Sequence, residues 1–555
     1  MSWGLIAGVA LLGCSRQITD PGVIYVDGLA AVEGDGRQES PYRTLRSALI
    51  HEGQYSHIMV AGDSVVAPSQ WMFTEAVTIA GWGHAETVLV PEQDDRFSWS
   101  SGLEVSLSHV KLGGTLETTG GIWSLSQLGF SGVPPKIVAS DSTLVVNQSV
   151  WEGGVGTVLS VEEGSVALHG VVINGVVPDE AASEGDVIVV RNATFEMVQS
   201  RIEHASERAL VLSNSVASVR ETALQGGTRS GLSALSGSVV SLSDVAVSDA
   251  TINLFVGTAR LDIVGGEVRN SGFVGVLAGE NSALSILDTR FEANREGHIS
   301  VLGPNTSVLI DGIHAQDAEL DSCVSVTGTD LPVVVQNSIL TGCAGTGFSG
   351  YQLGDVTVSG NEISDIALDL VVGESADGVS LLDSTGLIEK NHVQGVLGNG
   401  IAILRASARV QDNIIIDSGD AGIDLVDRSG DRSVFSGNYI EGASTAGVVV
   451  LNADADVIGN QIVNSLFRAE YGLGEGVAFG AGADVLVEDN DIEGSARSGV
   501  FYMDGASGTV RSNRISESGR YGIVEFCAPD FRVNSVFVDD NTLTDNAYGD
   551  VLGCP

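Results

Sequence analysis

Two groups of side chains in this sequence have the residue types that acid–base chemistry needs. Lys390 and His392 flank one asparagine of a repeat, which predicts that they stack beside Asp412 of the next unit. Downstream, Asp424 and Asp427 belong to the densest run of carboxylates in the chain. A basic side chain can abstract a proton, and paired carboxylates several ångströms apart can hydrolyse a glycosidic bond. An exposed ion pair explains the first group at least as well, so both groups are catalytic candidates only.

These candidates lie in a repeat that must position them. In five of its units a glycine follows an asparagine by nine residues, as Gly400 follows Asn391. A unit of constant pattern with variable inserts predicts a solenoid, in which each unit contributes one layer to a common core. A looser apolar pattern, with most spacings between 18 and 25 residues, extends the repeat back to Leu107. The asparagines are Asn361, Asn391, Asn413, Asn438, Asn460, Asn490, Asn513 and Asn541.

This asparagine column has two interpretations. Stacked amides could bind sugar hydroxyls. Alternatively, asparagine tolerates the left-handed backbone of a tight turn, and stacked amides can hydrogen-bond from layer to layer. We favour the structural interpretation, because a ligand site would not need all eight layers. The paired glycines are likewise expected where the backbone requires glycine at the start of a strand.

Composition limits the classes of partner. The 555 residues include 71 Asp and Glu against 27 Lys and Arg, a formal net charge of −44. This charge disfavours nucleic acid and anionic lipid headgroups, which basic residues bind. An acidic surface of this kind tolerates divalent or sodium counterions. The simplest interpretation is a solvated surface, and specific Ca²⁺ sites are a weaker alternative. With 71 glycines, 5% aromatic and 43% apolar residues, the chain suits many short strands joined by tight turns and is too apolar for disorder.

The N-terminus has the features of an export signal. Residues 5–13 are apolar, too few to span a membrane, and end at Cys14, as in the apolar core of a signal peptide. The sequence Leu-Leu-Gly-Cys at residues 11–14 resembles the lipobox of bacterial lipoproteins. The resemblance implies that residues 1–13 are a signal peptide, that Cys14 carries a lipid and that residues 14–22 are a tether. The alternative is a free cysteine on an apolar N-terminal segment.

The four other cysteines form two natural pairs. Cys323 and Cys343 are 20 residues apart, and Cys527 and Cys554 are 27 apart, each about one repeat unit. Stacked strands lie ~4.8 Å apart, inside the range of Cα–Cα distances that a disulfide accepts. We therefore expect disulfides Cys323–Cys343 and Cys527–Cys554 between neighbouring layers, in an oxidising compartment. Four buried thiols remain the alternative.

The segment after the tether has the pattern of a cap. Residues 23–27 are typical of a strand, and a glycine-rich turn follows at residues 34–36. Residues 40–49 predict a helix that begins near Pro41. Its apolar face consists of Leu45, Ala48 and Leu49. This series resembles the N-terminal signature of bacterial right-handed parallel β-helix proteins of the pectate lyase-like superfamily, in which such a helix covers the first layer.

The repeat and the resemblance together predict the fold. We expect an all-β protein made of a single right-handed parallel β-helix of roughly twenty coils. Residues 23–57 form the N-terminal strand and capping helix, and residues 58–555 form the solenoid, which is most regular over residues 358–543. The resemblance also implies that a lyase of this type would use a Lys or Arg base and often Ca²⁺ held by carboxylates.

Function on a repeat scaffold usually resides in its inserts, which lie here around residues 178–186, 373–378 and 466–475. We expect an exported, lipid-anchored, monomeric protein of the outer membrane or cell surface. It would bind a glycan or a cell-envelope protein without catalysis. A polysaccharide lyase or glycoside hydrolase is the alternative, and a purely structural spacer is the third hypothesis.

Overall fold

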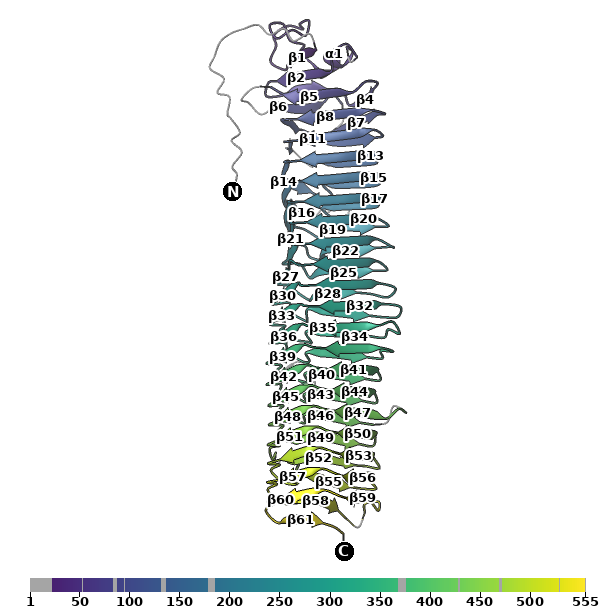
Figure 1. Ribbon diagram of the computed structural model, residues 1–555. Coiled ribbons are helices and arrows are strands. Elements are labelled where there is room, and N and C mark those ends of the chain that lie inside the picture. Colours follow the sequence, from purple (N-terminus) through teal and green to yellow (C-terminus); the bar gives the residue numbers. More distant parts are fainter. Residues whose placement is uncertain are drawn as a thin grey trace, which may run out of the picture. The chain divides into compact units, whose positions relative to one another are not determined.

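The chain folds as a β-solenoid, shown in Figure 1 as a computed structural model. It is an all-β, right-handed, parallel solenoid of about 19 turns with almost no helix, which confirms the predicted fold class. Two compact units, residues 1–150 and 151–555, are described in turn. The structure describes residues 22–51, 53–82, 87–93, 95–130, 136–177, 185–367, 376–427, 430–468, 472–528 and 530–554. The predicted signal peptide and Cys14 lie outside these residues, as does much of the three predicted inserts.

The first unit begins with the predicted strand and helix. Strand β1 (Val23–Asp27) pairs in parallel with β2 (His57–Ala61). Helix α1 (Leu45–Leu49) buries Leu45, Ala48 and Leu49, so its predicted face is confirmed. The helix begins at Leu45 rather than near Pro41, because Tyr42 forms a parallel bridge with Val26 and keeps the preceding chain extended. Thr44 caps the helix by accepting a hydrogen bond from the Ser47 backbone N–H.

Aromatic side chains fill much of the core of this unit. Trp99 and Trp123 are fully buried, and their rings lie 5.6 and 5.8 Å from that of Phe73. Each indole N–H donates to a backbone carbonyl, Trp99 to Pro68 at 2.8 Å and Trp123 to Gly120 at 2.7 Å. The buried polar atoms of these large side chains are therefore satisfied.

In the C-terminal part of the second unit each turn contributes three strands, and equivalent strands of successive turns pair in parallel. The first column comprises β40 (Val379–Leu382), β43 (Ile401–Leu404), β46 (Ile423–Val426), β49 (Ala446–Leu451), β52 (Glu475–Gly480), β55 (Val500–Met503), β58 (Tyr521–Phe526) and β61 (Gly549–Leu552). The second comprises β38 (Val356–Ser359), β41 (Thr385–Glu389), β44 (Ser407–Gln411), β47 (Ser433–Ser436), β50 (Asp454–Ile458), β53 (Asp484–Glu488), β56 (Ser507–Arg511) and β59 (Ser535–Asp539). The third comprises β39 (Glu362–Ser364), β42 (His392–Gln394), β45 (Ile414–Ile416), β48 (Tyr439–Glu441), β51 (Gln461–Val463), β54 (Asp491–Glu493), β57 (Arg514–Ser516) and β60 (Thr542–Thr544).

The asparagine column lies at the turn between second-column and third-column strands. Each amide nitrogen from Asn361 to Asn513 donates to the amide oxygen of the next asparagine at 2.8–3.0 Å. It also donates to a backbone carbonyl of the preceding coil, as Asn391 does to Val358 at 2.9 Å. The side chains from Asn361 to Asn513 are 1% exposed. These amides form an internal ladder and leave no group for a sugar.

The left-handed backbone that was expected at the asparagines lies one residue earlier. Lys390 and Asp412, which precede Asn391 and Asn413, have φ angles of 54° and 55°. Glycine occupies the same position before Asn438, with a φ of 65°. The asparagines are therefore selected for their hydrogen bonds and not for a left-handed conformation.

The glycine column is required by close packing. Gly422 has no positive φ, but a Cβ there would lie 2.4 Å from Ile440 Cγ2 and 2.6 Å from the Gly447 carbonyl oxygen. Gly400 and Gly476 meet the same pair of neighbours, an isoleucine of the next third-column strand and the next glycine carbonyl. Space, rather than backbone conformation, makes glycine necessary where the first-column strand begins.

Both cysteine pairs form disulfides in the structure. The Cα–Cα distances are 5.5 Å for Cys323–Cys343 and 5.9 Å for Cys527–Cys554. Among the residues described, no helix has the length and apolar character needed to cross a membrane.

Gly422→Ala should destabilise the coil that contains β46, because the new methyl group would have to displace Ile440 or the backbone of Gly447. Overpacking of this kind costs about 1–3 kcal/mol. Since long repeat arrays unfold in more than two states, the measurement is native-state hydrogen exchange of the β46 amides. Gly102→Ala is the matched control, because no heavy atom lies within 4 Å of its Cβ position. Equal losses of protection around both sites would contradict the packing explanation.

Candidate functional site

The predicted basic cluster is only partly assembled. Lys390 and Asp412 occupy the same turn position in successive coils, and Lys390 Nζ lies 3.8 Å from a Glu389 carboxylate oxygen with its side chain 64% exposed. His392 lies two residues further along the chain, in β42, where it pairs with Glu362 and Ile414. The parallel register therefore places His392 beside Ile414 instead of Asp412, and these three residues form no common site.

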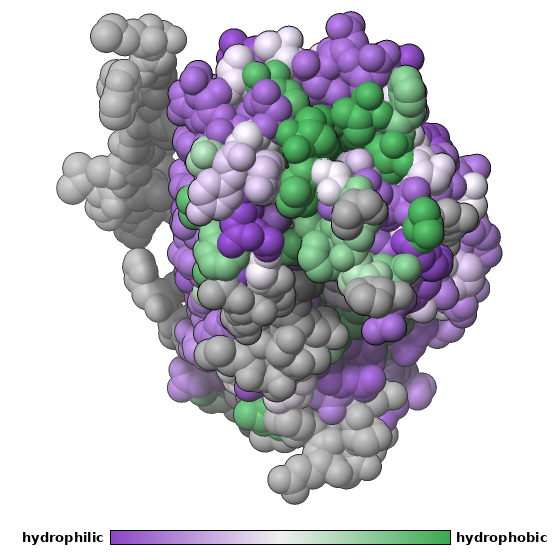
Figure 2. Space-filling model, turned by 90° about the horizontal axis from the view of Figure 1, so that it is seen from below, coloured by the Kyte–Doolittle hydropathy of each residue, from purple (hydrophilic) through white to green (hydrophobic). Residues whose placement is uncertain are grey.

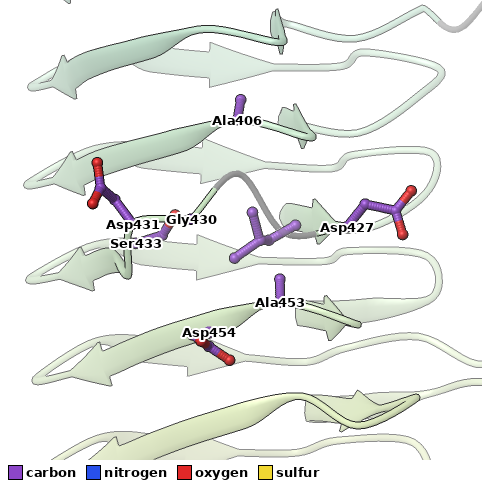
Figure 3. A pocket seen from close by; sticks show the side chains of 8 residues that line it. Ala406, Asp427, Gly430, Asp431, Ser433, Ala453 and Asp454 are labelled. Carbon is purple, nitrogen blue, oxygen red and sulfur yellow. The ribbon is translucent and has the colours of Figure 1, made fainter.

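Asp424 lies within β46, whereas Asp427 lies in the turn that follows this strand. It follows β46 with a φ of 63°, and its Oδ1 accepts a hydrogen bond from Asn452 Nδ2 at 3.1 Å. It lines a cavity of about 20 Å³, room for roughly one water molecule. Figure 3 shows the carboxylates of Asp427 and Asp431 on opposite sides of this cavity, directed away from it. The cavity is too small for a sugar.

Asp424 occupies an unusual position for a carboxylate. It is half-buried on the outward face of β46, paired with Ala402 on one side and Val449 on the other. Burial raises its pKa to about 7, with further contributions from the negative charges of Asp377 and Asp420. Near neutral pH this carboxyl group therefore exchanges a proton readily.

The two neighbouring carboxylates are held by the turns that lead into first-column strands. Asp377 Oδ1 accepts from the Asn399 backbone N–H at 2.7 Å and from Asn399 Nδ2 at 3.1 Å. Asp420 Oδ1 accepts from Arg468 Nη1 at 2.8 Å, and the same nitrogen donates to the Gly419 carbonyl at 2.9 Å. The side chain of Asp377 is 1% exposed, so its charge acts in a poorly hydrated environment.

Arg468 comes from the predicted insert around residues 466–475. The described ends of this insert form an antiparallel bridge between Arg468 and Leu473. Glu475, fully buried, fixes its far end: Oε2 accepts from the Gly474 backbone N–H at 2.5 Å, and Oε1 lies 3.4 Å from Arg497 Nε. Burial raises the pKa of Glu475, and the Arg497 charge opposes that rise. The insert is thereby fixed beside the Asp420 turn two coils earlier.

An apolar stripe continues from Asp424 along the outward face of the first column. Its members, Val449, Ala478, Phe501 and Val524, pair in register and are only 5–8% exposed. Leu451, Met503 and Tyr521 pack against them. Outward side chains of a solenoid normally face water, whereas these are buried, so the stripe is a second apolar cluster on the outward side of the first column. We call it the outer stripe.

The outer stripe leads to exposed aromatic rings near the C-terminal end. The ring of Phe526 lies 5.9 Å from that of Phe501 and 5.8 Å from that of Phe531. Phe526 and Phe531 are 43% and 39% exposed, and Tyr548 is 67% exposed with its ring 5.9 Å from Tyr521. Figure 2 shows hydrophobic residues gathered on the end of the molecule that is seen from below.

Two broader depressions lie in the part of this unit nearer its start. One has a volume of about 600 Å³ and is lined by polar turn residues that include Gln199, Glu221 and Asp244. The other, of about 490 Å³, is lined by Thr228, Asp249 and neighbouring residues. Neither is lined by an aromatic ring from the described ranges. The candidate site is therefore the Asp424 cluster together with the outer stripe.

Metal binding at this cluster finds little support in its geometry. Within the described ranges, the one group of three His, Cys, Asp or Glu ligand atoms lying within 4.8 Å of one another is Glu525, Cys527 and Cys554. Asp377, Asp420 and Asp424 are therefore not arranged as a three-ligand set. The predicted Ca²⁺ binding stays a prediction.

Asp377, Asn399 and Arg468 were not among the predicted site residues. One sequence signal could have found the first two, since each immediately precedes a glycine of the column, as the buried Glu475 does. Aligning the repeat on its glycines brings these polar residues together. Arg468 lies outside this alignment, and its signal is its place in the insert around residues 466–475, where function was predicted to reside.

Comparison with known proteins agrees with the architecture. The family model described as "Right handed beta helix region" matches residues 299–467 and 459–553. No curated protein matches the chain.

Several solved structures of low sequence identity match. A mutant of the periplasmic alginate epimerase AlgG is 9% identical over 75% of this chain and 77% of its own, with a TM-score of 0.24. The PL6 family alginate lyase AlyGC is 10% identical over 96% of this chain and 100% of its own, with a TM-score of 0.24. The A-module of Azotobacter vinelandii mannuronan C-5 epimerase AlgE4 is 13% identical over 91% of both chains, with a TM-score of 0.14. At these identities and scores the similarities bear on no residue of the candidate site.

Asp424→Asn should remove a pH dependence of stability. The folded carboxyl group keeps its proton up to a pKa of about 7, whereas in the unfolded chain it ionises near pH 4. The unfolded state therefore releases this proton first as pH rises, and the free energy of unfolding falls between about pH 4 and pH 7. Asparagine stays neutral, so the variant should exceed the wild type in stability above pH 7 by on the order of 2 kcal/mol.

The measurement is hydrogen exchange of the β46 and β49 amides from pH 4 to pH 8, corrected for the intrinsic exchange rate. Asp412→Asn, an exposed turn residue outside the cluster, should keep the wild-type slope. An identical slope in wild type and Asp424→Asn would show that Asp424 ionises normally.

Proposed function

We propose that the protein binds a glycan chain on the outward face of the first column, between Asp424 and Phe526, without cleaving it. The observation that carries this proposal is the set of exposed aromatic rings, Phe526, Phe531 and Tyr548, at one end of the outer stripe, whose other end is the carboxyl group of Asp424. Ligand sites commonly combine apolar and aromatic surface with a few well-placed polar groups. Sugars need both, because their C–H faces pack on rings and their hydroxyl groups bond to carboxylates.

Charge favours a neutral glycan. The chain carries a net charge of −44, and two cations beside the outer stripe are already paired, Arg468 with Asp420 and Arg497 with Glu475. A polymer of uronic acids would meet a repulsive field at such a surface. Neutral polysaccharides avoid this repulsion.

Glycoside hydrolysis is the second candidate, and one observation supports it. Asp424 has a pKa raised to about 7, whereas its neighbour Asp420 is paired with Arg468. A carboxyl group that keeps its proton near neutral pH can serve as general acid, with a second carboxylate beside it as charged partner. In that case Asp424 would protonate the leaving oxygen.

Binding should appear on an array of neutral polysaccharides and should weaken in Phe526→Ala. Loss of an aromatic contact costs about 0.5–1.5 kcal/mol, equivalent to a roughly two- to twelvefold rise in Kd. Phe537→Ala is the matched control, because Phe537 is 62% exposed on β59, outside the stripe. Equal effects of the two substitutions, or no binding to any neutral glycan, would refute the proposal. Product release on the same glycans that is lost in Asp424→Asn would establish the hydrolase instead.

We also propose that the protein is exported and anchored by a lipid on Cys14, at the outer membrane or cell surface. The apolar run at residues 5–13 and two disulfides support this proposal. The monomeric state also stays a prediction. Labelled palmitate fed to cells that produce the full chain should enter the wild-type protein and not the Cys14→Ser variant. Equal labelling of both would refute the anchor.

A further inference from the structure

One inward position of the first column holds apolar or aromatic residues in successive strands and then an acidic residue in β58, near the C-terminal end. Leu425, Val450, Phe479 and Tyr502 follow one another in register as buried inward side chains of the first column. The next residue in this column is Glu525, which pairs with Tyr502. Burial of the phenol, with a further contribution from the negative charge of Glu525, raises the pKa of Tyr502 to about 12. A carboxylate has replaced an apolar core residue where nothing in the repeat requires it.

Two cysteines meet this carboxylate. Cys527 follows the end of β58, and β61 pairs with β58 so that Val551 lies beside Ile523 and Leu552 beside Val524. This register brings Cys554 to the same end of the strand pair. One ligand atom from each of Glu525, Cys527 and Cys554 lies within 4.8 Å of the other two.

Hydrogen bonds orient the carboxylate toward this group. Glu525 Oε2 accepts from the Cys554 backbone N–H at 3.4 Å, and Oε1 accepts from Asn534 Nδ2 at 3.3 Å. Asn534 Oδ1 in turn accepts from the backbone N–H groups of Gly505 and Ala506 at 3.0 and 3.1 Å. Glu525 is therefore held in place by a partner that is itself fixed to the preceding turn.

The other disulfide lacks this environment. Cys323 and Cys343 are 0% exposed, and in the described part of the chain no carboxylate or histidine joins them in a three-ligand group. Cys527 is exposed, and Cys554 is half-buried. The second pair is therefore open to a reductant and to an ion, whereas the first is an internal cross-link.

We propose that Glu525, Cys527 and Cys554 form a zinc site when their disulfide is reduced, so that the last coil is fastened either by a sulfur–sulfur bond or by Zn²⁺. A dithiol reductant supplies two electrons and two protons, the Cys527–Cys554 bond breaks to give two thiols, and the reductant becomes a cyclic disulfide. Zn²⁺ then displaces the two thiol protons and binds both thiolates and one carboxylate oxygen, with water as fourth ligand. Ligand distances of about 2.3 Å to sulfur and 2.0–2.2 Å to oxygen fit atoms this close together. Thiolate ligands favour zinc over Ca²⁺ or Mg²⁺.

The test uses the full chain, reduced with a phosphine that is then removed under an oxygen-free atmosphere. Titration with Co²⁺, followed by competition with Zn²⁺, should give one ion per chain and the charge-transfer absorption of cobalt–thiolate bonds. The oxidised protein should show neither. Glu525→Gln should weaken binding by at least about tenfold, and the double variant Cys527→Ser with Cys554→Ser should abolish it.

The matched control is Cys323→Ser with Cys343→Ser, which should keep stoichiometric binding because both ligand thiols remain. Absence of metal uptake by the reduced wild type would overturn the proposal. So would uptake that survives Cys527→Ser with Cys554→Ser, or a Glu525→Gln affinity equal to that of the wild type. Hydrogen exchange in β61 adds a second readout, since Zn²⁺ should restore the protection that reduction removes.

Discussion

The parallel register between successive coils is the constraint on which the rest of this structure depends. Each strand is short, and few bonds within one coil hold it in place. Backbone pairing to the coils on either side fixes it, and any shift by one residue would turn every core side chain outward. In the second unit two columns prevent such a shift. The asparagine ladder links neighbouring turns through buried amides, and the glycine column admits the next strand at a distance that excludes any Cβ.

The same register also stacks the charged side chains of neighbouring coils above one another. Equivalent residues of neighbouring coils lie one strand spacing apart, so an acidic chain places carboxylates above carboxylates. Several of its few arginines relieve this repulsion by pairing with an acid on an adjacent coil. Arg405 Nε lies 2.9 Å from Asp383 Oδ1, and Arg511 Nη2 lies 2.8 Å from Glu488 Oε1. In the part of the chain that the structure describes, Asp424 has no such arginine partner, and burial raises its pKa instead. A raised pKa indicates a candidate functional site, which the acids paired with arginine do not.

The features that recur in every coil could be predicted from sequence, whereas those made by one coil could not. Asn391 and Gly400 predict a solenoid because every layer has the same local requirement. The capping helix could be predicted because α1 buries three residues at helical spacing. His392 was misplaced because residues on the two sides of an asparagine align with different neighbours, Lys390 with Asp412 but His392 with Ile414. The environment of Asp424 depends on Asp377 and on Arg468, which sequence distance separates and only the winding of the chain unites.

The insert between Asn460 and Gly476 has a wider consequence. Sixteen residues separate this pair where five other units have nine, yet Asn460 keeps its amide bonds to Asn438 and Asn490. Gly476 likewise keeps its close contacts with Ile492 and with the Gly499 carbonyl. The columns on either side thus isolate the turn mechanically from the sheet. For evolution, such a turn is a place where sequence can be added and tried without cost to the scaffold, and here the added sequence delivers an arginine to a carboxylate two coils away.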